Sequence, residues 1–447
     1  MKKYVVICAP VTSRSGYGDH ARDLVEGLLE NDNFNVRILD VPWGQTPRNA
    51  LDKNNKIHEL IRKKMASPLN PIDDKKQPDL YIDIRIPNEF QNPGKYNIGI
   101  TAGIETNAVS QTWLEGCNKM DLIIVPSEHS RHGFVQSIYD KVNNTPDGQQ
   151  QVVGQLKLDK PMEVLFEGAD EDVYKPLHHK DIDKDFFNWL NTEVPEKFAF
   201  LSVGLWGKGD YGEDRKDVSR LLKIFYESFA NKKKRPALIL KTNGAGFSIL
   251  DKEDILKKMK QMKNHFPNDW ELPNVYLLHG SLSSTEMNYL YNHPKIKALV
   301  SLTHGEGFGR PLLEATMTGL PVIASNWSGH LDFLDKEKSI LLGGQLQDVP
   351  ESQVWEDILI KESKWFVIDE NQTYKIFNFA FENKYEVKNN AKSLMYKNRE
   401  KFTLNNMAKV LDEMIGSHIK DMPEQVSIKL PKLKKSKPKM TLEEETV

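Results

Sequence analysis

The most informative stretch of the sequence is His304-Gly305-Glu306-Gly307-Phe308-Gly309-Arg310-Pro311-Leu312-Leu313-Glu314-Ala315. It follows an apolar run that predicts a strand, and Pro311 stands where a helix can begin. The free N–H groups of a helix start favour phosphate, and carboxylates such as Glu306 and Glu314 accept hydrogen bonds from hydroxyls. The stretch therefore predicts a site for a ligand with both phosphate and hydroxyl groups. The alternative is an ordinary turn with two surface acids.

Outward from this stretch, short apolar runs alternate with segments of helical periodicity, which predicts β-α-β units around parallel sheets. The predicted strands of the second half are residues 198–203, 237–240, 275–278, 298–302 and 322–325. Those of the first half are residues 4–9, 35–40, 80–84, 96–100, 122–125 and 164–166, with helices over 19–29 and 127–139. We therefore expect an α/β protein with two Rossmann-like domains, whose parallel sheets face each other across a ligand cleft.

The two halves are separated by a loop-like stretch over residues 167–176 and a charged segment over 180–184. The first domain is expected over residues 1–176 and the second over residues 177–395. A terminal helix is expected over residues 396–419. Residues 420–447 are rich in Lys and Pro before an acidic end, a composition that cannot bury a core and favours disorder.

The composition excludes several classes of protein. With 447 residues, 39% hydrophobic and 28% charged, the chain can bury the cores of two or three domains. No apolar run approaches a membrane span, and the first strand lacks a signal-peptide cleavage pattern. Cys8 and Cys117 form neither a disulfide framework nor a metal-ligand pattern, so we expect a cytoplasmic protein. The net charge of −2 argues against a surface built throughout for nucleic acid.

The motifs resemble those of retaining glycosyltransferase family four. That family carries a Glu-x7-Glu motif of the form E-G-F-G-x-P-x-x-E-A and then G-x-P-V-I, which residues 306–315 and 319–323 match. Residues 121–128 look like the last strand and serine of its N-terminal domain, and residues 167–170 like its interdomain G-x-D linker. The resemblance implies the GT-B fold, with an N-terminal acceptor domain and a C-terminal nucleotide-sugar donor domain. It also implies a terminal helix that crosses back to the N-terminal domain, and retention of anomeric configuration.

The resemblance also implies roles on the donor side. Glu306 would contact the transferred sugar, Glu314 the ribose hydroxyls and Lys216 the pyrophosphate. Cations beside a helix start can neutralise a diphosphate leaving group. The family's arginine after the strand-ending glycine is replaced by Leu205, so a second cation must come from elsewhere, namely Arg215, Lys208 or Lys241. The predicted donor site comprises Gly16, Arg215, Lys216, Lys241, Gly307, Phe308, Gly309, Arg310 and Glu314, and the predicted catalytic residues are Glu306, Lys216 and Glu105.

A second glycine-rich turn, over residues 15–21, opens the first predicted helix and matches G-x-G-x-x-A. Asp40 ends the next strand, at about the distance of a ribose-binding acid, which keeps an NAD-dependent oxidoreductase as an alternative. The six residues 10–15 are too many for the tight dinucleotide turn. In the glycosyltransferase interpretation the Gly16 N–H lies near the donor phosphates, and Tyr17 and His20 lie on the acceptor side.

Glu105 stands in Thr101-Ala102-Gly103-Ile104-Glu105-Thr106, where many relatives carry a histidine. The segment resembles a subset of the family with W-E-x followed by P-x-x-W, and Trp113 fits the last position. Glu105 is expected to bind sugar or acceptor hydroxyls, or to stabilise positive charge at the anomeric carbon. A loop acid is the equal alternative. Asp181-Ile182-Asp183 resembles a metal-binding D-x-D but lies in a charged linker, so we expect no catalytic metal and no cofactor besides the co-substrate.

The acceptor is the part on which the sequence is least informative. A glycan, lipid, small molecule, protein or hydroxymethylated DNA base would suit such a fold, and a non-catalytic sugar-nucleotide-binding protein is a further alternative. Six lysines among residues 429–439 form the clearest basic run, which would attract a nucleic acid or an anionic membrane. The acidic residues 443–445 favour a solvated end instead.

Overall fold

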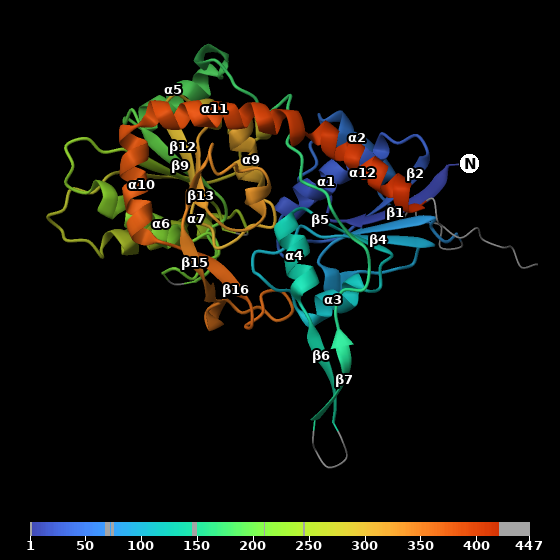
Figure 1. Cartoon of the computed structure of the whole chain (residues 1–447). Coiled ribbons are helices and arrows are strands. Elements are labelled where there is room, and N and C mark those ends of the chain that lie inside the picture. Colours follow the sequence, from blue (N-terminus) through green and yellow to red (C-terminus); the bar gives the residue numbers. More distant parts are fainter. Residues whose placement is uncertain are drawn as a thin grey trace, which may run out of the picture.

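The protein is described here by a computed structural model, which covers residues 2–67, 72, 76–144, 150–209, 211–244 and 246–419. Two six-stranded parallel sheets lie side by side (Figure 1). The first has the order β2-β1-β3-β4-β5-β8 and contains β1 (Lys3–Ala9), β2 (Phe34–Asp40), β3 (Leu80–Ile84), β4 (Tyr96–Ile100), β5 (Leu122–Val125) and β8 (Met162–Val164). The second has the order β11-β10-β9-β12-β13-β14 and contains β9 (Ala199–Val203), β10 (Ala237–Lys241), β11 (Val275–Leu278), β12 (Ile296–Ser301), β13 (Val322–Ser325) and β14 (Ile340–Leu342).

The strand order determines where a ligand can bind. It reverses between β1 and β3 in the first sheet and between β9 and β12 in the second. In open parallel sheets the loops at the carboxyl ends of the strands diverge at such a reversal and leave room for a ligand. Both glycine-rich stretches of the sequence leave the sheet at these reversals, one after β1 and the other after β12.

Helices cover both sheets, and the apolar stripe of each helix packs against its sheet. In the first half they are α1 (Gly16–Leu29), α2 (Lys56–Lys64), α3 (Gln111–Cys117) and α4 (Glu128–Gln136). In the second they are α5 (Lys184–Glu193), α6 (Val218–Phe229), α7 (Ile249–Lys263), α8 (Ser284–Asn292), α9 (Arg310–Met317) and α10 (Glu370–Glu382). Leu221, Phe225 and Phe229 on α6 are buried in the second core, as the helical spacing of the sequence predicts. Short 3₁₀ turns lie at Pro87–Glu89, His179–Asp181, Gly329–Asp332 and Glu351–Gln353.

Two helices link the sheets at the end of the described chain. α11 (Lys384–Lys401) packs against α9, and α12 (Leu404–His418) packs against α1, where Met407, Leu411 and Ile415 enter the first core. Figure 1 shows the pair running across the top of the molecule. Within the range expected for one terminal helix, residues 396–419, the structure has the end of α11 and the whole of α12, because Thr403 interrupts the helical run and caps α12 by accepting from the Asn406 N–H.

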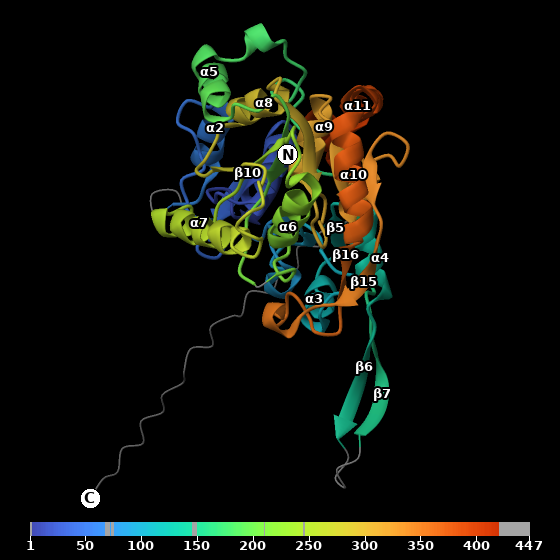
Figure 2. The same ribbon diagram turned by 90° about the vertical axis from the view of Figure 1, so that its left-hand side faces the viewer.

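The sequence patterns did not predict two β-hairpins that the structure contains. β6 (Tyr139–Asn144) and β7 (Gln150–Leu156) pair antiparallel and project from the first half (Figures 1 and 2). The helix expected over residues 127–139 ends at Gln136, and β8 ends at Val164 although a strand was expected to reach residue 166. β15 (Gly344–Asp348) and β16 (Lys364–Ile368) form the other hairpin. The side chains of β7 before Leu156 and all those of β15 are exposed, so neither strand shows the alternation of a half-buried strand.

Residues 429–439, on which the expected polyanion contact depends, lie outside the described residues. Within the described residues, none of the helices combines the length and apolar character needed to cross a membrane.

Candidate active site

Four charged side chains meet where the loops of the two sheets come together. Arg215 Nη1 lies 3.1 Å from Glu105 Oε1 and 3.7 Å from Glu306 Oε2, and Lys216 Nζ contacts Glu306 Oε1. Glu105 comes from the loop after β4, the two cations from the loop after β9, and Glu306 from the loop after β12. The structure thus brings together the three predicted catalytic residues and Arg215 in a chain of alternating charge.

The burial of this chain is uneven. The side chains of Glu306 and Lys216 are 11% and 17% exposed, whereas those of Glu105 and Arg215 are 36% and 38% exposed. Burial acts to raise the pKa of Glu306, but Lys216 and Arg215 hold it below its ordinary value. Burial lowers the pKa of Lys216 in spite of the Glu306 carboxylate, which acts in the opposite direction. Lys216 and Glu306 therefore form an ion pair with little water around it. Because the local dielectric constant is low there, electrostatic interactions with an anionic ligand are strengthened.

Two glycines allow the halves of the molecule to touch at this site. A Cβ on Gly305 would lie 1.8 Å from the Glu105 carbonyl oxygen, and a Cβ on Gly307 would lie 2.0 Å from that of Ala102. Neither position has room for a side chain, because the obstacle is backbone in both cases. Ser127 Oγ also donates to the Gly307 carbonyl at 2.6 Å. Gly307 of the Glu-x7-Glu motif, and Gly305 just before the motif, are thus explained by the close approach of the first half of the chain.

The start of α9 shows how the rest of the motif is used. Gly309 has φ +103 and is the N-cap of α9, a conformation that favours glycine. Phe308 was predicted in the donor site, but its side chain is 2% exposed and packs on Phe333 at 5.1 Å between ring centroids. Only its backbone remains available to a ligand, since the apolar ring is more stable in the core.

Arg310 is engaged elsewhere than the sequence suggested. Its Nη1 lies 2.5 Å from Asp23 Oδ2 on α1 and 3.7 Å from Glu167 Oε2. A single cation thus faces carboxylates from the first half of the chain, and burial raises the pKa of Glu167 to about 8. The predicted contact between Arg310 and the donor would require this ion pair between the halves to open. Neither acid could be recognised from the sequence, because Asp23 lies within a helix and Glu167 within a loop, far from each other.

Glu314 lies in the first turns of α9 and contacts tyrosines. The hydroxyl of Tyr291 donates to Glu314 Oε2 at 3.3 Å. Burial raises the pKa of Glu314 to about 7, in spite of Arg310, which lowers it. A carboxyl in this state can exchange hydrogen bonds with ligand hydroxyls.

Lys241, the remaining predicted cation, ends β10 beside the loop that bears Lys216. Its Nζ donates to the Gly280 carbonyl at 2.7 Å, and burial lowers its pKa to about 8. The backbone of Gly280 therefore already holds this cation. Lys208, the other suggested cation, lies on the exposed part of the loop after β9.

The start of α1 carries Gly16, which was predicted in the donor site, and Tyr17, which was predicted on the acceptor side. Gly16 is the exposed first residue of this helix, and Ser15 caps it by accepting from the Gly18 N–H. The Tyr17 hydroxyl lies 2.7 Å from Thr101 Oγ1 and accepts from the Ala102 N–H, next to Gly307. Its ring stacks on Trp43 at 3.9 Å, a neighbour that the sequence patterns did not indicate.

His20 is placed differently from the prediction. Its side chain faces the interior, with 1% of the residue exposed, and burial lowers its pKa to about 3. It therefore cannot contact an acceptor in this conformation. It lies on the buried face of α1 together with Ala21 and Leu24, as the helical period requires.

A search of the described residues finds no group of three or more His, Cys, Asp or Glu side chains that could hold a metal ion. The D-x-D triplet falls in the 3₁₀ turn His179–Asp181 and the cap of α5, where Asp183 accepts from backbone N–H groups.

Comparison with known proteins assigns the class. Residues 213–356, which include the Lys216 loop and the Glu-x7-Glu motif, match the family described as "Glycosyl transferases group 1". A search of curated proteins finds no match. The fold is similar to Anabaena HepE in complex with UDP-glucose, at a TM-score of 0.58 and 14% identity, over 93% of this chain and 100% of that chain.

Two further solved structures share this fold. Sucrose-phosphate synthase from Thermosynechococcus elongatus has a TM-score of 0.59 and 13% identity, over 93% of this chain and 99% of that one. A UDP-forming α,α-trehalose-phosphate synthase from Burkholderia xenovorans, in complex with glucose-6-phosphate, has a TM-score of 0.58 and 11% identity, over 93% and 99% of the chains. At these identities the likeness shows the fold, which is GT-B.

The chain is therefore a glycosyltransferase. Its residues 213–356 are similar to the glycosyl transferases of group 1, which favours this interpretation over the oxidoreductase alternative.

Proposed function

We propose that the protein transfers the sugar of a nucleoside diphosphate sugar to a hydroxyl acceptor with retention of anomeric configuration. The observation that carries this proposal is the contact of Lys216 and Arg215 with Glu306 at the junction of the two halves. A diphosphate bound there would meet two cations in a partly dry site. Such preorganised charge is usually the largest contribution to catalysis of this kind.

In the proposed reaction the bond between the anomeric carbon and the phosphate oxygen breaks, and the electron pair stays on the diphosphate. Lys216 and Arg215 neutralise the charge that develops. The acceptor oxygen then bonds to the anomeric carbon on the face that the diphosphate leaves, and its proton passes to a phosphate oxygen. No protein nucleophile takes part, and Glu306 binds the hydroxyls of the transferred sugar.

The closed junction supports a second part of the proposal. The backbone contacts at Gly305 and Gly307 leave no space for a side chain between these loops at either position. Closure of this kind protects a donor from hydrolysis. Glu105 belongs to the first half of the chain and contacts Arg215 of the second half. This ion pair can therefore form only when the two halves are together.

The first test is a panel of UDP-, GDP- and ADP-glucose, assayed for nucleotide release, with the anomeric configuration of any product read by NMR. UDP-glucose is the first probe, because the similar fold of Anabaena HepE was solved with it. Release of a nucleoside diphosphate with a product of unchanged configuration is expected. A product of inverted configuration would contradict the proposal.

The second test separates the two glutamates of the motif. Glu306→Gln should lower turnover strongly and leave nucleotide affinity nearly intact. Glu314→Ala should weaken nucleotide binding by roughly 1.5–3 kcal/mol, the net value of a hydrogen bond to a charged group. Calorimetry and steady-state kinetics measure the two effects. Equal and small effects in both variants would refute the assignment of the site.

A further inference from the structure

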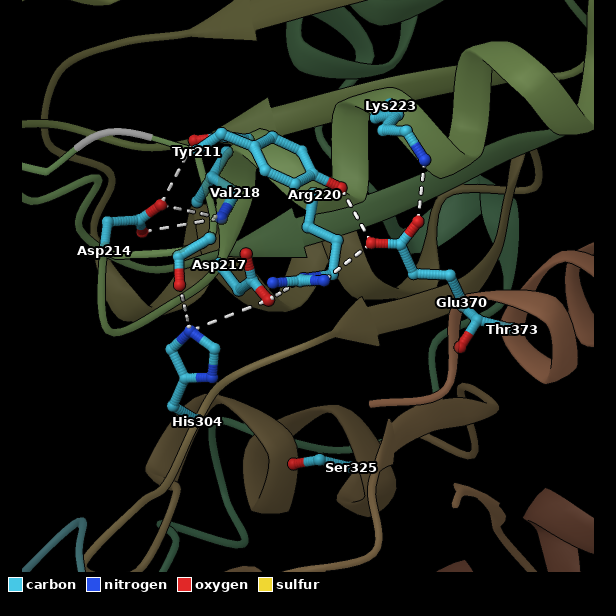
Figure 3. A network of polar contacts seen from close by, with 12 residues as sticks. Tyr211, Asp214, Asp217, Val218, Arg220, Lys223, His304, Ser325, Glu370 and Thr373 are labelled. Carbon is cyan, nitrogen blue, oxygen red and sulfur yellow. Dashed lines mark hydrogen bonds and ion pairs between the residues drawn. The ribbon is translucent and has the colours of Figure 1, made fainter. Parts of the chain in front are cut away.

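The loop that carries Lys216 is held by a network of buried polar groups. We call residues 211–217 the lysine loop. Figure 3 shows the imidazole of His304 pointing toward this loop from below and the pair of Arg220 and Glu370 beside it. The ring of His304 stacks on Trp365 at 4.2 Å with 16° between the planes, which fixes its orientation.

His304 joins the lysine loop to β16 through both of its ring nitrogens. Nε2 lies 3.0 Å from the Gly212 carbonyl oxygen, and Nδ1 lies 2.7 Å from the Phe366 carbonyl oxygen. A carbonyl oxygen is only an acceptor, so each ring nitrogen is placed to donate a hydrogen bond. The imidazolium form can donate both at once, and the neutral form only one.

The charges around the ring are mixed. Asp217 Oδ2 lies 3.6 Å from Nε2, and both side chains are fully buried. Burial lowers the pKa of His304, the two carbonyls and Asp214 raise it, and Arg220 lowers it. Either charge state of His304 that retains the bond to the Gly212 carbonyl can hold the lysine loop.

His304 also holds the loop through its backbone. Its N–H donates to the Arg215 carbonyl at 2.9 Å, and Thr303 Oγ1 donates to the same oxygen at 3.3 Å. Since His304 stands two residues before Glu306, one short segment contacts the loop of the cation and carries its carboxylate partner. The segment from His304 to Glu306 therefore fixes the position of Lys216 relative to Glu306.

The far side of the lysine loop is held by the second arm of the network. Asp217 has φ 50, a conformation that few residues other than glycine adopt, and its Oδ2 accepts from Arg220 Nε at 2.6 Å. Arg220 Nη1 donates to Glu370 at 2.6 Å, and the Tyr211 hydroxyl donates to the same carboxylate at 2.8 Å. Both ends of the loop are thus held by side chains that lie outside the charged site.

We infer that His304 is a positioning residue, which with the arm of Asp217, Arg220 and Glu370 holds the lysine loop so that Lys216 meets the diphosphate of the donor. This inference rests on the proposed function, because it assumes that Lys216 binds the diphosphate. A histidine that only fills the core would stabilise the fold without a preference for diphosphate ligands. The two roles therefore differ in which ligand the substitution affects.

The test compares His304→Gln with His304→Asn. The amide nitrogen of Gln can reach the place of Nε2 and keep the bond to Gly212, whereas that of Asn reaches only the place of Nδ1 and the bond to Phe366. Binding of UDP and of uridine is measured by calorimetry for each full-length variant, with GDP and guanosine or ADP and adenosine if the donor panel selects them. The ratio of the two affinities reports the diphosphate contact alone.

The Asn variant is expected to lose roughly three- to tenfold of this ratio, as for one hydrogen bond, and the Gln variant less than about twofold. Equal loss in both variants, or no loss in either, would overturn the inference. Lys216→Ala is measured in parallel. If that variant keeps the wild-type ratio, the proposed function fails and not the positioning role alone.

A second pair of variants keeps the inference testable if the His304 variants do not fold. Glu370→Ala releases both Tyr211 and Arg220, and a loss of the affinity ratio is expected. Lys223→Ala removes only the contact of Lys223 Nζ with Glu370 and Glu227, outside the lysine loop, and serves as the matched control. An unchanged ratio in Glu370→Ala, or the same loss in Lys223→Ala, would contradict the inference.

Discussion

Gly307→Ala tests whether the closed junction is the working conformation. The new Cβ would lie 2.0 Å from the Ala102 carbonyl oxygen and 3.2 Å from Gly103 Cα, whereas real Cβ atoms essentially never come within 3.0 Å of another atom. Both obstacles are backbone of the first half of the chain. The two halves must therefore separate by about 1 Å, and a misplacement of that size can cost on the order of 100-fold in rate.

The cost should fall on closure and not on folding. Overpacking costs about 1–3 kcal/mol, which corresponds to roughly 5- to 150-fold in turnover if only the closed state bears it. The melting temperature should stay close to that of the wild type, because the clash is relieved when the halves part. Donor turnover is measured by steady-state kinetics, the melting temperature by thermal denaturation, and the separation of the two halves by small-angle scattering.

Gly416→Ala is the matched control, since within the described residues a Cβ at this position would meet no atom within 4 Å beyond the backbone of its own helix. It lies in α12 and should leave turnover and scattering unchanged. If Gly307→Ala keeps the wild-type turnover and the wild-type scattering profile, the contact between the loops is not required for activity. A large loss of melting temperature would show that the glycine serves the fold and not the closure.

Three further predictions concern other parts of the chain. Glu105→Gln should impair transfer to the acceptor at unchanged donor affinity, and wild-type transfer would leave Glu105 a loop acid. Burial raises the pKa of Glu167 to about 8, so its contribution to stability is full below its ordinary pKa of 4.5 and declines as the pH rises through 8. Denaturant titrations at pH 5 and pH 8 measure how much unfolding free energy each protein loses between these two pH values. The wild type should lose more than Glu167→Gln, by on the order of 3 kcal/mol, and an equal loss in both proteins would contradict this. Truncation after Ile419 should preserve donor hydrolysis; if the full-length protein ignores duplex DNA and anionic vesicles at about 50 mM salt, the expected polyanion contact of residues 429–439 is wrong.

The fold could be predicted in good part from the sequence because its signals are local. The buried strands β1, β3, β4 and β5 are continuous apolar runs, and α6 has an apolar stripe at helical spacing. The hairpin of β6 and β7 was missed because most of its side chains face solvent, which leaves no periodic pattern to recognise. The break between α11 and α12 was missed because a threonine within a helical pattern does not by itself mark a helix start. Only the structure shows that the Thr403 side chain caps α12.

For the site, the sequence by itself determined which residue types could serve: Lys216, Glu306 and Glu314 stand in motifs whose spacing follows from a strand, a glycine turn and a helix start. Only the tertiary structure decided how they are paired. Arg310 faces Asp23 across the junction, and His304 reaches the carbonyl of Gly212, contacts between segments far apart in the chain. Such partners leave no local pattern, because the energy of an ion pair or a hydrogen bond depends on distance in space, and the separation along the sequence does not enter it.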